Sequence, residues 1–209
     1  AFVPEYDYLI SFDYSQIELR VLAHLANVTS LIQAFNENKD IHRHTASVVF
    51  GVSEDEVTST MRRNAKAVNF GIIYGMSDYG LAEQLGVTVK EAKSFIEKYF
   101  EKYAEIKEYM NKSIAFGKEN GYVSTVLNRK RYIPEINEKN YMRQEFGKRL
   151  AMNSPIQGSA ADIIKLAMIK VDQLLKENHM KSKMILQVHD ELIFDVYEDE
   201  LEQMMKLVQ

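Results

Sequence analysis

The chain has 209 residues, of which 46% are hydrophobic and 27% charged, with a formal net charge of −4 at pH 7. This composition is typical of a soluble globular protein, and the length allows one large or two small domains. The lack of cysteine excludes disulfide bonds and thiolate metal sites and favours a reducing, cytoplasmic location. Because no apolar run is long enough to cross a bilayer and no signal-peptide pattern opens the chain, no membrane partner is expected.

The charges are segregated along the chain. Residues 60–66 hold three cations and no acid, residues 128–149 are rich in lysine and arginine, and residues 190–202 are strongly acidic. A protein that binds a polyanion with one surface and metal ions with another would show this pattern. The simpler alternative is a set of solvated helix faces, which is the usual role of charged runs.

The apolar pattern predicts a strand near each end of the chain and mostly helices between them. Thr88 and Glu91 form a capping box, Thr60 is expected to cap another helix, and Pro155 with Gly158 is expected to interrupt the helical chain. In chain order, the expected elements are a strand at 9–14, helices at 17–25, 30–36, 42–50, 61–74, 76–86 and 88–119, a hairpin at 122–134, helices at 140–153 and 159–178, and a hairpin at 184–197.

The fold class that follows from these elements is α+β. The first strand and the last hairpin would form a small antiparallel sheet backed by helices, and a mostly helical subdomain would be inserted between them. Because the chain starts without methionine and ends inside an expected helix, it is interpreted as part of a longer protein.

Asp13 and Asp190 lie near opposite ends of the chain, and each interrupts a short apolar run. A buried carboxylate is unfavourable unless a partner compensates its charge. Both would be compensated if the two strands paired and the carboxylates shared divalent metal ions. Each aspartate could instead be an ordinary turn or cap residue. Flanking His189 and Glu191 weaken that simpler interpretation without proving a metal site.

The expected helix at 61–74 carries two cations and then two aromatic residues at intervals of four. Arg62, Lys66, Phe70 and Tyr74 would therefore follow one side of the helix. Cations suit a triphosphate and an aromatic face suits a base, so this side could hold a nucleotide. On spacing alone, an amphipathic core helix whose cations reach solvent is the better explanation.

Arg149, Asn153 and Gln157 form a further polar cluster, with Gln157 after the expected helix break. Their amide and guanidinium groups could contact minor-groove acceptors near a primer end, although ordinary polar surface explains these residues better when they are taken alone. His42 and His44 could bind a metal, but no cysteine or third neighbouring histidine supports a zinc site. The phosphate-loop pattern GxxxxGK[ST] does not occur, which disfavours phosphate-loop ATPases and kinases.

Three ordered motifs resemble the family A DNA polymerases, the DNA polymerase I type. DYSQIELR at 13–20 resembles the first palm motif of that family, RRNAKAVNFGIIYG at 62–75 its fingers-helix motif, and QVHDE at 187–191 its last palm motif. DIHRHTA at 40–46 and RLAMNSPIQGSAADIIK at 149–165 match further family segments. The likeness covers essentially the whole chain in the family's order and is greatest to a bacterial enzyme.

The resemblance implies a DNA-templated DNA polymerase that adds deoxynucleotides to a primer 3′-hydroxyl. Asp13 and Asp190 would be ligands of two Mg²⁺ ions, Glu191 a nearby acid, and Lys66 a catalytic proton donor to pyrophosphate. Glu18 would be a steric gate that crowds the sugar 2′ position. The nucleotide-binding residues would be Gln16, Glu18, His42, Arg62, Lys66, Phe70 and Tyr74. The primer–template contacts would be Arg149, Asn153, Gln157 and His189.

The resemblance also implies domains and partners. Residues 1–24 and 148–209 would form a discontinuous, incomplete palm, and residues 25–147 the fingers. The expected partners are primer–template DNA and deoxynucleoside triphosphates, and the chain is expected to be a monomer. The thumb and other palm segments of family polymerases have no counterpart in this sequence. The 209-residue chain alone is therefore expected to extend a primer weakly or not at all.

Two other functions remain open at this point. A single-subunit RNA polymerase shares the palm chemistry, but Glu18 disfavours it because a 2′ gate has no use where ribose is the substrate. A nucleic-acid-binding module that has lost catalysis is the non-enzymatic alternative. The presence of Asp13, Asp190, Arg62 and Lys66 disfavours that alternative for the parent protein.

Overall fold

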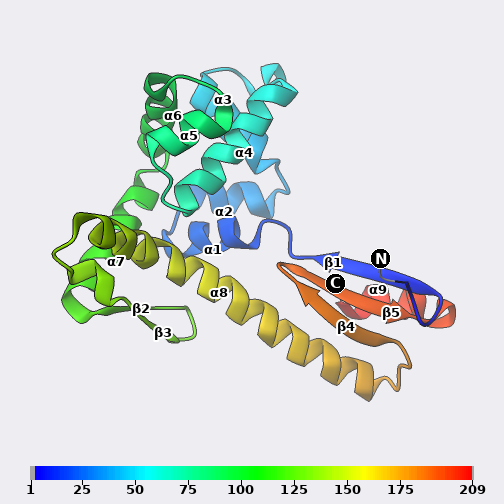
Figure 1. Cartoon of the computed structure of the whole chain (residues 1–209). Helices are drawn as coiled ribbons and strands as arrows, with labels where there is room; N and C mark the ends of the chain where they lie inside the picture. The colour runs from blue at the N-terminus through cyan, green and yellow to red at the C-terminus, as the bar shows by residue number, and fades with distance from the viewer. Residues whose placement is uncertain (1–2, 209) are drawn as a thin grey trace. The chain divides into compact units, whose positions relative to one another are not determined.

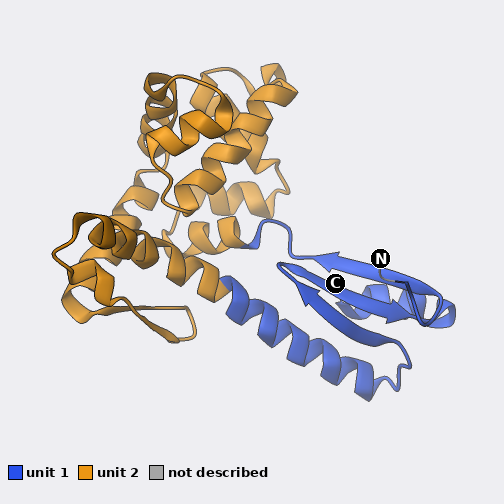
Figure 2. Ribbon diagram, viewed as in Figure 1, with its two compact units in different colours: residues 1–17, 160–209 blue, residues 18–159 orange. Residues whose placement is uncertain are grey.

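The computed structural model describes residues 3–208 and divides into two compact units (Figure 2). Unit 1 comprises residues 1–17 and 160–209, and unit 2 comprises residues 18–159. The fold class is α+β, as predicted, with a mostly helical chain and two small antiparallel sheets. No helix in the described range is long and apolar enough to cross a membrane.

Unit 1 contains a three-stranded antiparallel sheet. Its strands, in spatial order, are β1 (Tyr8–Asp13), β5 (Glu191–Val196) and β4 (Lys183–Val188) (Figure 1). Pairing of β1 with β5 confirms that the first strand joins the last hairpin, and Asp13 lies opposite Glu191. Leu192, Phe194 and Val196 are fully buried, as expected for alternate residues on the buried face of a central strand.

Two carboxylates, buried Asp195 and half-buried Glu200, accept hydrogen bonds from backbone N–H groups beside this sheet. Asp195 is 4% exposed and accepts hydrogen bonds from the backbone N–H groups of Glu5 at 2.9 Å and Tyr6 at 3.1 Å. Glu200 accepts one from the backbone N–H of Ser182 at 2.8 Å. Because backbone donors compensate Asp195, its burial is tolerated and its role is structural. The unit ends with a 3-10 helix, η3 (Glu198–Glu200), and α9 (Leu201–Val208).

Unit 2 is mostly helical. In it α3 packs against α4 and α5 against α6. Fully buried Ala46 and Ala65 belong to a small apolar cluster on α3 and α4, where short side chains let helices approach closely. The first seven helices are α1 (Ile17–Leu25), α2 (Thr29–Asn36), α3 (Ile41–Phe50), α4 (Ser59–Ile73), α5 (Asp78–Leu85), α6 (Val89–Lys102) and α7 (Ala104–Asn120), and η1 (Glu54–Glu56) is a 3-10 helix.

Two predicted helix boundaries are wrong. Thr58 rather than Thr60 caps α4, because its side chain accepts a hydrogen bond from the backbone N–H of Met61 at 3.2 Å. The single helix predicted at 88–119 is two helices, α6 and α7, separated at Tyr103, where φ is −118° and ψ is 59°. The Tyr103 side chain is fully buried. The apolar spacing continues through this break, so the sequence pattern did not reveal it.

The predicted interruption at Pro155 and Gly158 is also wrong, because α8 (Tyr141–Glu177) is one continuous helix with Pro155 inside it. The hairpin of β2 (Tyr122–Ser124) and β3 (Lys130–Tyr132) contacts α8 in the stretch that follows Pro155. Ser159 donates a hydrogen bond to the carbonyl oxygen of Pro155 at 2.5 Å and accepts one from the backbone N–H of Val126 at 3.0 Å. A 3-10 helix, η2 (Pro134–Asn137), links the hairpin to α8.

Candidate functional site

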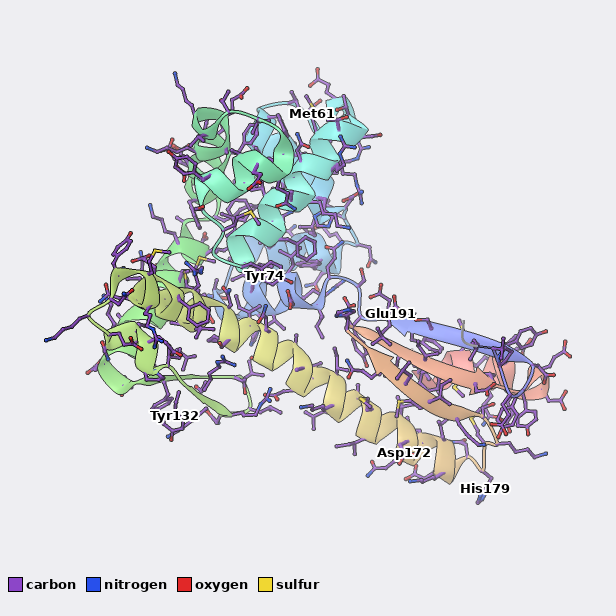
Figure 3. All side chains as sticks on the ribbon, in the orientation of Figure 1. Met61, Tyr74, Tyr132, Asp172, His179 and Glu191 are labelled. Carbon is purple, nitrogen blue, oxygen red and sulfur yellow. The ribbon has the colours of Figure 1, made fainter. Side chains whose placement is uncertain are left out.

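An acidic corner forms where β1 ends beside the turn of the β4–β5 hairpin. The backbone N–H of Tyr14 donates a hydrogen bond to the carbonyl oxygen of Asp190 at 2.9 Å, immediately beyond the pairing of Asp13 with Glu191. The turn residue His189 has a φ of 51°, in the left-handed region, as the reversal of direction requires. Figure 3 labels Glu191 at this end of β5. The sheet register therefore brings Asp13 and Asp190 together from opposite ends of the chain.

The three acids of this corner repel one another. Asp13 is exposed and not buried as expected, but partial desolvation of its carboxyl, followed by the negative charges of Asp190 and Glu191, still raises its pKa above the usual value. Glu191 accepts a hydrogen bond from the Ser11 hydroxyl at 2.9 Å. A divalent cation would relieve this repulsion, and oxygen donors are what Mg²⁺ prefers.

No group of three or more His, Cys, Asp or Glu side chains within residues 3–208 is arranged to hold a metal ion. A site for Mg²⁺ does not require such a group, because Mg²⁺ is usually held by one or two carboxylates together with water and substrate phosphates. The two aspartates therefore fit a Mg²⁺ site that substrate would complete.

The side of α4 that carries the cations also carries the aromatic residues. Lys66 Nζ lies 5.9 Å from the centroid of the Phe70 ring, which stacks on the Tyr74 ring with centroids 6.4 Å apart. Tyr74 is the first residue after the helix and is 40% exposed. Arg62, one turn before Lys66, donates a hydrogen bond from Nε to Asp40 at 2.6 Å. Unit 2 thus presents cations and then an aromatic stack along one helix.

Asp40 fixes both Arg62 and the start of α3. It caps α3 by accepting hydrogen bonds from the backbone N–H groups of His42 and Arg43, each at 3.1 Å. Although burial opposes ionisation, the Arg62 and Arg43 hydrogen bonds hold the pKa of the Asp40 carboxyl below its usual value. Asp40 was not among the residues predicted from the sequence, although its position before a helix start was a usable signal.

His42 lies beside this cationic row but is buried, with 3% of its surface exposed. Burial lowers its pKa to about 4; the Asp40 charge opposes this shift, and Arg62 and Lys66 add to it. Its Nδ1 lies 3.0 Å from the side-chain nitrogen of Asn69, which is also buried. The imidazole is therefore neutral at neutral pH. Asn69 was missed as well, although a polar residue within an apolar stretch of α4 was a usable signal.

Glu18, in the first turn of α1, contacts the end of this row. The Tyr74 hydroxyl donates a hydrogen bond to Glu18 Oε2 at 2.9 Å. Gln16, in unit 1, has a φ of 55°, and its side-chain oxygen is buried with no hydrogen-bond partner among the described residues. The Tyr74 hydroxyl therefore fixes the Glu18 carboxylate, whereas the side-chain oxygen of Gln16 could still accept a hydrogen bond from a ligand.

Arg149, Asn153 and Gln157 lie four residues apart on the continuous helix α8. Gln157 therefore continues their row instead of following a break, which corrects the prediction. The side-chain oxygen of Asn153 is buried without a hydrogen-bond partner in the described part of the chain. Gly75, with a φ of 64°, approaches this helix so closely that a Cβ atom would lie 3.1 Å from Arg149 Cγ.

Apart from Gln16, the predicted site residues therefore fall into three groups. Unit 1 brings together Asp13, Asp190, Glu191 and His189. Unit 2 brings together Glu18, His42, Arg62, Lys66, Phe70 and Tyr74, and it carries the α8 row of Arg149, Asn153 and Gln157.

A comparison with protein families gives a match along the whole chain, residues 1–209, to "DNA polymerase family A". The chain belongs to this family. Family A polymerases generally use Mg²⁺. The resemblance and the fold class predicted from the sequence are thereby confirmed.

Named relatives agree with this assignment. The chain is 56% identical over 210 residues to DNA polymerase I of Bacillus subtilis (strain 168), which covers all of this chain and 24% of that protein. It is 58% identical over 201 residues to DNA polymerase I of Caldicellulosiruptor bescii, covering 95% of this chain and 24% of that protein. The chain thus spans about a quarter of the length of these relatives.

A solved structure is also similar. It is described as the POL domain of Pol1 from M. smegmatis in complex with DNA primer-template and dNTP. The two chains share 47% sequence identity with a TM-score of 0.93, and the match covers 97% of this chain and 36% of that one.

Proposed function

We propose that this chain is the catalytic part of a DNA-templated DNA polymerase that adds deoxynucleotides to a primer 3′-hydroxyl. The observation that carries the proposal is the meeting of Asp13 and Asp190 at one end of the sheet, in a family A chain. The structural relative bound to primer-template and dNTP supports the same substrates here.

Asp13 and Asp190 would hold two Mg²⁺ ions. When bound, these ions would lower the pKa of the primer hydroxyl and neutralise charge on the leaving pyrophosphate. The reaction forms a bond between the primer 3′-oxygen and the α-phosphorus and breaks the bond from that phosphorus to pyrophosphate. Glu191, hydrogen-bonded to Ser11, would stay near the ions without an obligatory role as ligand.

The row on α4 would receive the nucleotide. Arg62, held by Asp40, and Lys66 would neutralise the triphosphate, and Lys66 would give a proton to the departing pyrophosphate. Phe70 would pack on the sugar, and Tyr74 would lie beside the new base pair. Neutral His42 would contact the phosphate end.

Other residues would select and position substrates. Glu18, held by the Tyr74 hydroxyl, would crowd the 2′ position and reject ribonucleotides, with Gln16 nearby. The primer–template would contact the α8 row and His189. The members of that row are Arg149, Asn153 and Gln157. The side-chain oxygens of Gln16 and Asn153, which have no hydrogen-bond partner among the described residues, support this assignment, because each could accept a hydrogen bond from a bound substrate.

The palm would comprise residues 1–24 and 148–209, and the fingers residues 25–147. The protein would act as a cytoplasmic monomer. Since the chain covers 24% of its relatives' length, the 209-residue polypeptide produced alone would bind primer–template poorly and extend it weakly. Processive extension by that polypeptide would contradict this part of the proposal.

The test of the proposed function is Asp190→Asn in the full-length protein that carries this chain. Mg²⁺-dependent primer extension should fall at least about 10³-fold, because the metal pair loses an anionic ligand, while affinity for primer–template stays within a few-fold. Asp199→Asn, an exposed acid of η3, is the matched control and should keep its activity. Near-normal turnover by Asp190→Asn would overturn the assignment.

A further inference from the structure

A buried hydrogen-bond network joins α3 to α4 beside His42. The Thr45 hydroxyl on α3 donates to Oδ1 of Asn69 on α4 at 3.1 Å, and Asn69 Nδ2 lies 3.0 Å from His42 Nδ1. All three side chains are buried. The proposed polymerase function gives a role to His42 but none to Thr45 or Asn69.

The Asn69 amide determines which nitrogen of the His42 ring carries the proton. An NH₂ group can only donate a hydrogen bond, so Nδ1 must accept it and cannot itself carry a proton. The neutral imidazole has a single ring proton, which is therefore on Nε2. The other tautomer would place two donors against each other in a buried site where neither could turn to water.

The Thr45 hydroxyl holds the Asn69 amide in this orientation. It donates to Oδ1, which can only accept, and so leaves Nδ2 facing His42. A reversed amide would turn Oδ1 toward Nδ1 and favour the opposite tautomer. Because α3 and α4 pack against each other, the three groups stay within hydrogen-bond distance.

The ring of His42 lies among the groups proposed to hold the nucleotide. Its centroid is 6.0 Å from that of the Phe70 ring. The charged groups that act on it are Asp40, immediately before α3, and Arg62 and Lys66 on α4. Since the two cations disfavour a positive charge on the ring, His42 can attract a phosphate oxygen only through the N–H of its neutral form.

We propose that Asn69, oriented by Thr45, is a positioning residue that keeps the His42 proton on Nε2, so that Nε2 donates a hydrogen bond to a phosphate oxygen of the incoming nucleotide. This inference rests on the proposed function, which assigns His42 to the triphosphate. A hydrogen bond to a charged oxygen is stronger than one between neutral groups, whereas the other tautomer would present a lone pair to the anion. Thr45 and Asn69 act only through His42.

The test is Asn69→Asp in the full-length protein, measured as the apparent dissociation constant of the nucleotide in single-turnover primer extension. The new carboxylate has nearly the same shape as the amide but only accepts, so it draws the His42 proton to Nδ1. It also favours a second proton on the ring, so at pH 6 Nε2 can still donate, whereas at pH 9 Nε2 presents a lone pair to the phosphate. The ratio of the variant's dissociation constant to that of the wild-type protein, which cancels titration of the nucleotide itself, should therefore rise about tenfold from pH 6 to pH 9.

Two control variants separate this effect from packing and from titration of the new carboxylate. Asn69→Leu keeps the volume but removes the donor, so its loss of affinity should not depend on pH. In His42→Gln/Asn69→Asp, compared with His42→Gln, the pH trend should disappear, because a glutamine amide has no second tautomer. A trend that persists in either control would overturn the proposal. So would a flat ratio for Asn69→Asp, which is the result expected if the amide has the reversed orientation.

Thr45→Val tests the network without placing a charge in the core. Valine has the shape of threonine but lacks the hydroxyl, so the Asn69 amide is free to reverse and the dissociation constant should rise a few-fold. Ser47→Ala is the matched control, because it removes a hydroxyl of the same helix that donates to the His44 carbonyl oxygen at 2.7 Å, and it should change the constant less than about twofold. Equal losses in these two variants would overturn the proposal. Circular dichroism shows whether each variant folds, and this pair decides the matter if Asn69→Asp does not.

The outcomes distinguish this inference from the proposed function. If His42→Leu, which removes both ring nitrogens, leaves the dissociation constant of the nucleotide unchanged, His42 does not contact the triphosphate and the inference is wrong. That result would leave the loss of turnover expected for Asp190→Asn untouched. Near-normal turnover by Asp190→Asn would instead overturn the proposed function.

Discussion

In unit 1 the acidic corner depends on a sheet that joins the two ends of the chain, whereas in unit 2 the nucleotide row follows successive turns of one helix. Ser11 and Glu191, which border the corner, are 180 residues apart and hydrogen-bonded. Lys66 and Phe70 on α4 are one turn apart. The corner exists only when the sheet has its native register, because a shift of one residue would turn every side chain to the other face. The row survives any change that leaves α4 helical.

This difference predicts how substitutions act. A change in the corner should remove the metal site as a whole, whereas a change in the row should remove one contact with the nucleotide. Four predictions concern the row and the two residues beside it, His42 and Glu18, from the largest expected effect to the smallest.

Lys66→Ala should lower kcat by about 10²–10³-fold, because loss of a positioned proton donor typically costs that much. Binding of primer–template should change little, since Lys66 is assigned to the nucleotide. Single-turnover incorporation kinetics would measure this effect, with Lys90→Ala as the control. A Lys66→Ala enzyme with normal kcat would remove the proton-donor role and leave α4 as a packing helix.

His42 should make stability depend on pH. Its pKa is about 4 in the folded protein and about 6.5 when unfolded, so between these values the unfolded state binds more protons. The stabilisation is complete above pH 6.5 and is lost as pH falls toward 4, by an upper limit on the order of 3 kcal/mol.

Urea unfolding from pH 4 to 7.5 would measure this dependence. His42→Gln should flatten the profile across that window. His24→Gln, at an exposed position of α1, should retain it. A slope that is equally steep in His42→Gln would mean that another group titrates.

Glu18→Ala should reduce discrimination against ribonucleotides by about 10²-fold, because the pocket no longer excludes the 2′-hydroxyl. Tyr74→Phe removes only the hydroxyl that holds Glu18 and should give a smaller loss in the same direction. The measurement is the ratio of kcat/KM for deoxynucleotide and ribonucleotide incorporation. An unchanged ratio in both variants would contradict the gate.

Phe70→Tyr should ease incorporation of dideoxynucleotides by at least a few-fold. The added hydroxyl can supply the hydrogen bond that the missing sugar 3′-hydroxyl no longer makes, and one such bond contributes about 1 kcal/mol. Competition between dideoxy and deoxy substrates on a sequencing template would measure it. No change would mean that Phe70 does not face the sugar.

Much of the fold followed from the sequence because its signals are local or strongly periodic. The first strand and the closing hairpin have clear apolar runs, and their pairing is confirmed. The capping box at Thr88 and Glu91 is present, with the Thr88 side chain accepting from the Glu91 N–H at 3.2 Å. These features depend on neighbours in sequence and on burial of one face.

The errors arose where tertiary contacts override local preference. Proline disfavours a helix interior because it has no backbone N–H to donate, but α8 continues through Pro155, in the stretch where the hairpin of β2 and β3 contacts Ser159. Burial of Tyr103 fixes a non-helical backbone in a stretch that reads as one helix. Local propensity carries neither kind of information.

In the candidate site, too, features with a local sequence signal could be predicted and features that depend on tertiary contacts could not. The row on α4 was visible as a spacing of four, but its dependence on Asp40 was not, because that ion pair joins separate helices. The sequence could place Asp13 and Asp190 close together only on the assumption that the first strand pairs with the last hairpin. The docking of the hairpin of β2 and β3 on α8 could not be predicted, since it depends on the close approach of Thr125 to Gly158.

The most direct test of the central claim is to locate metal ions in a crystal of the full-length protein with primer–template and an incoming nucleotide. With Mn²⁺ in place of Mg²⁺, anomalous scattering should give two peaks about 3.5–4 Å apart, both within ligand distance of Asp13 and Asp190. Occupied substrate sites without any metal peak at these two carboxylates would contradict the account.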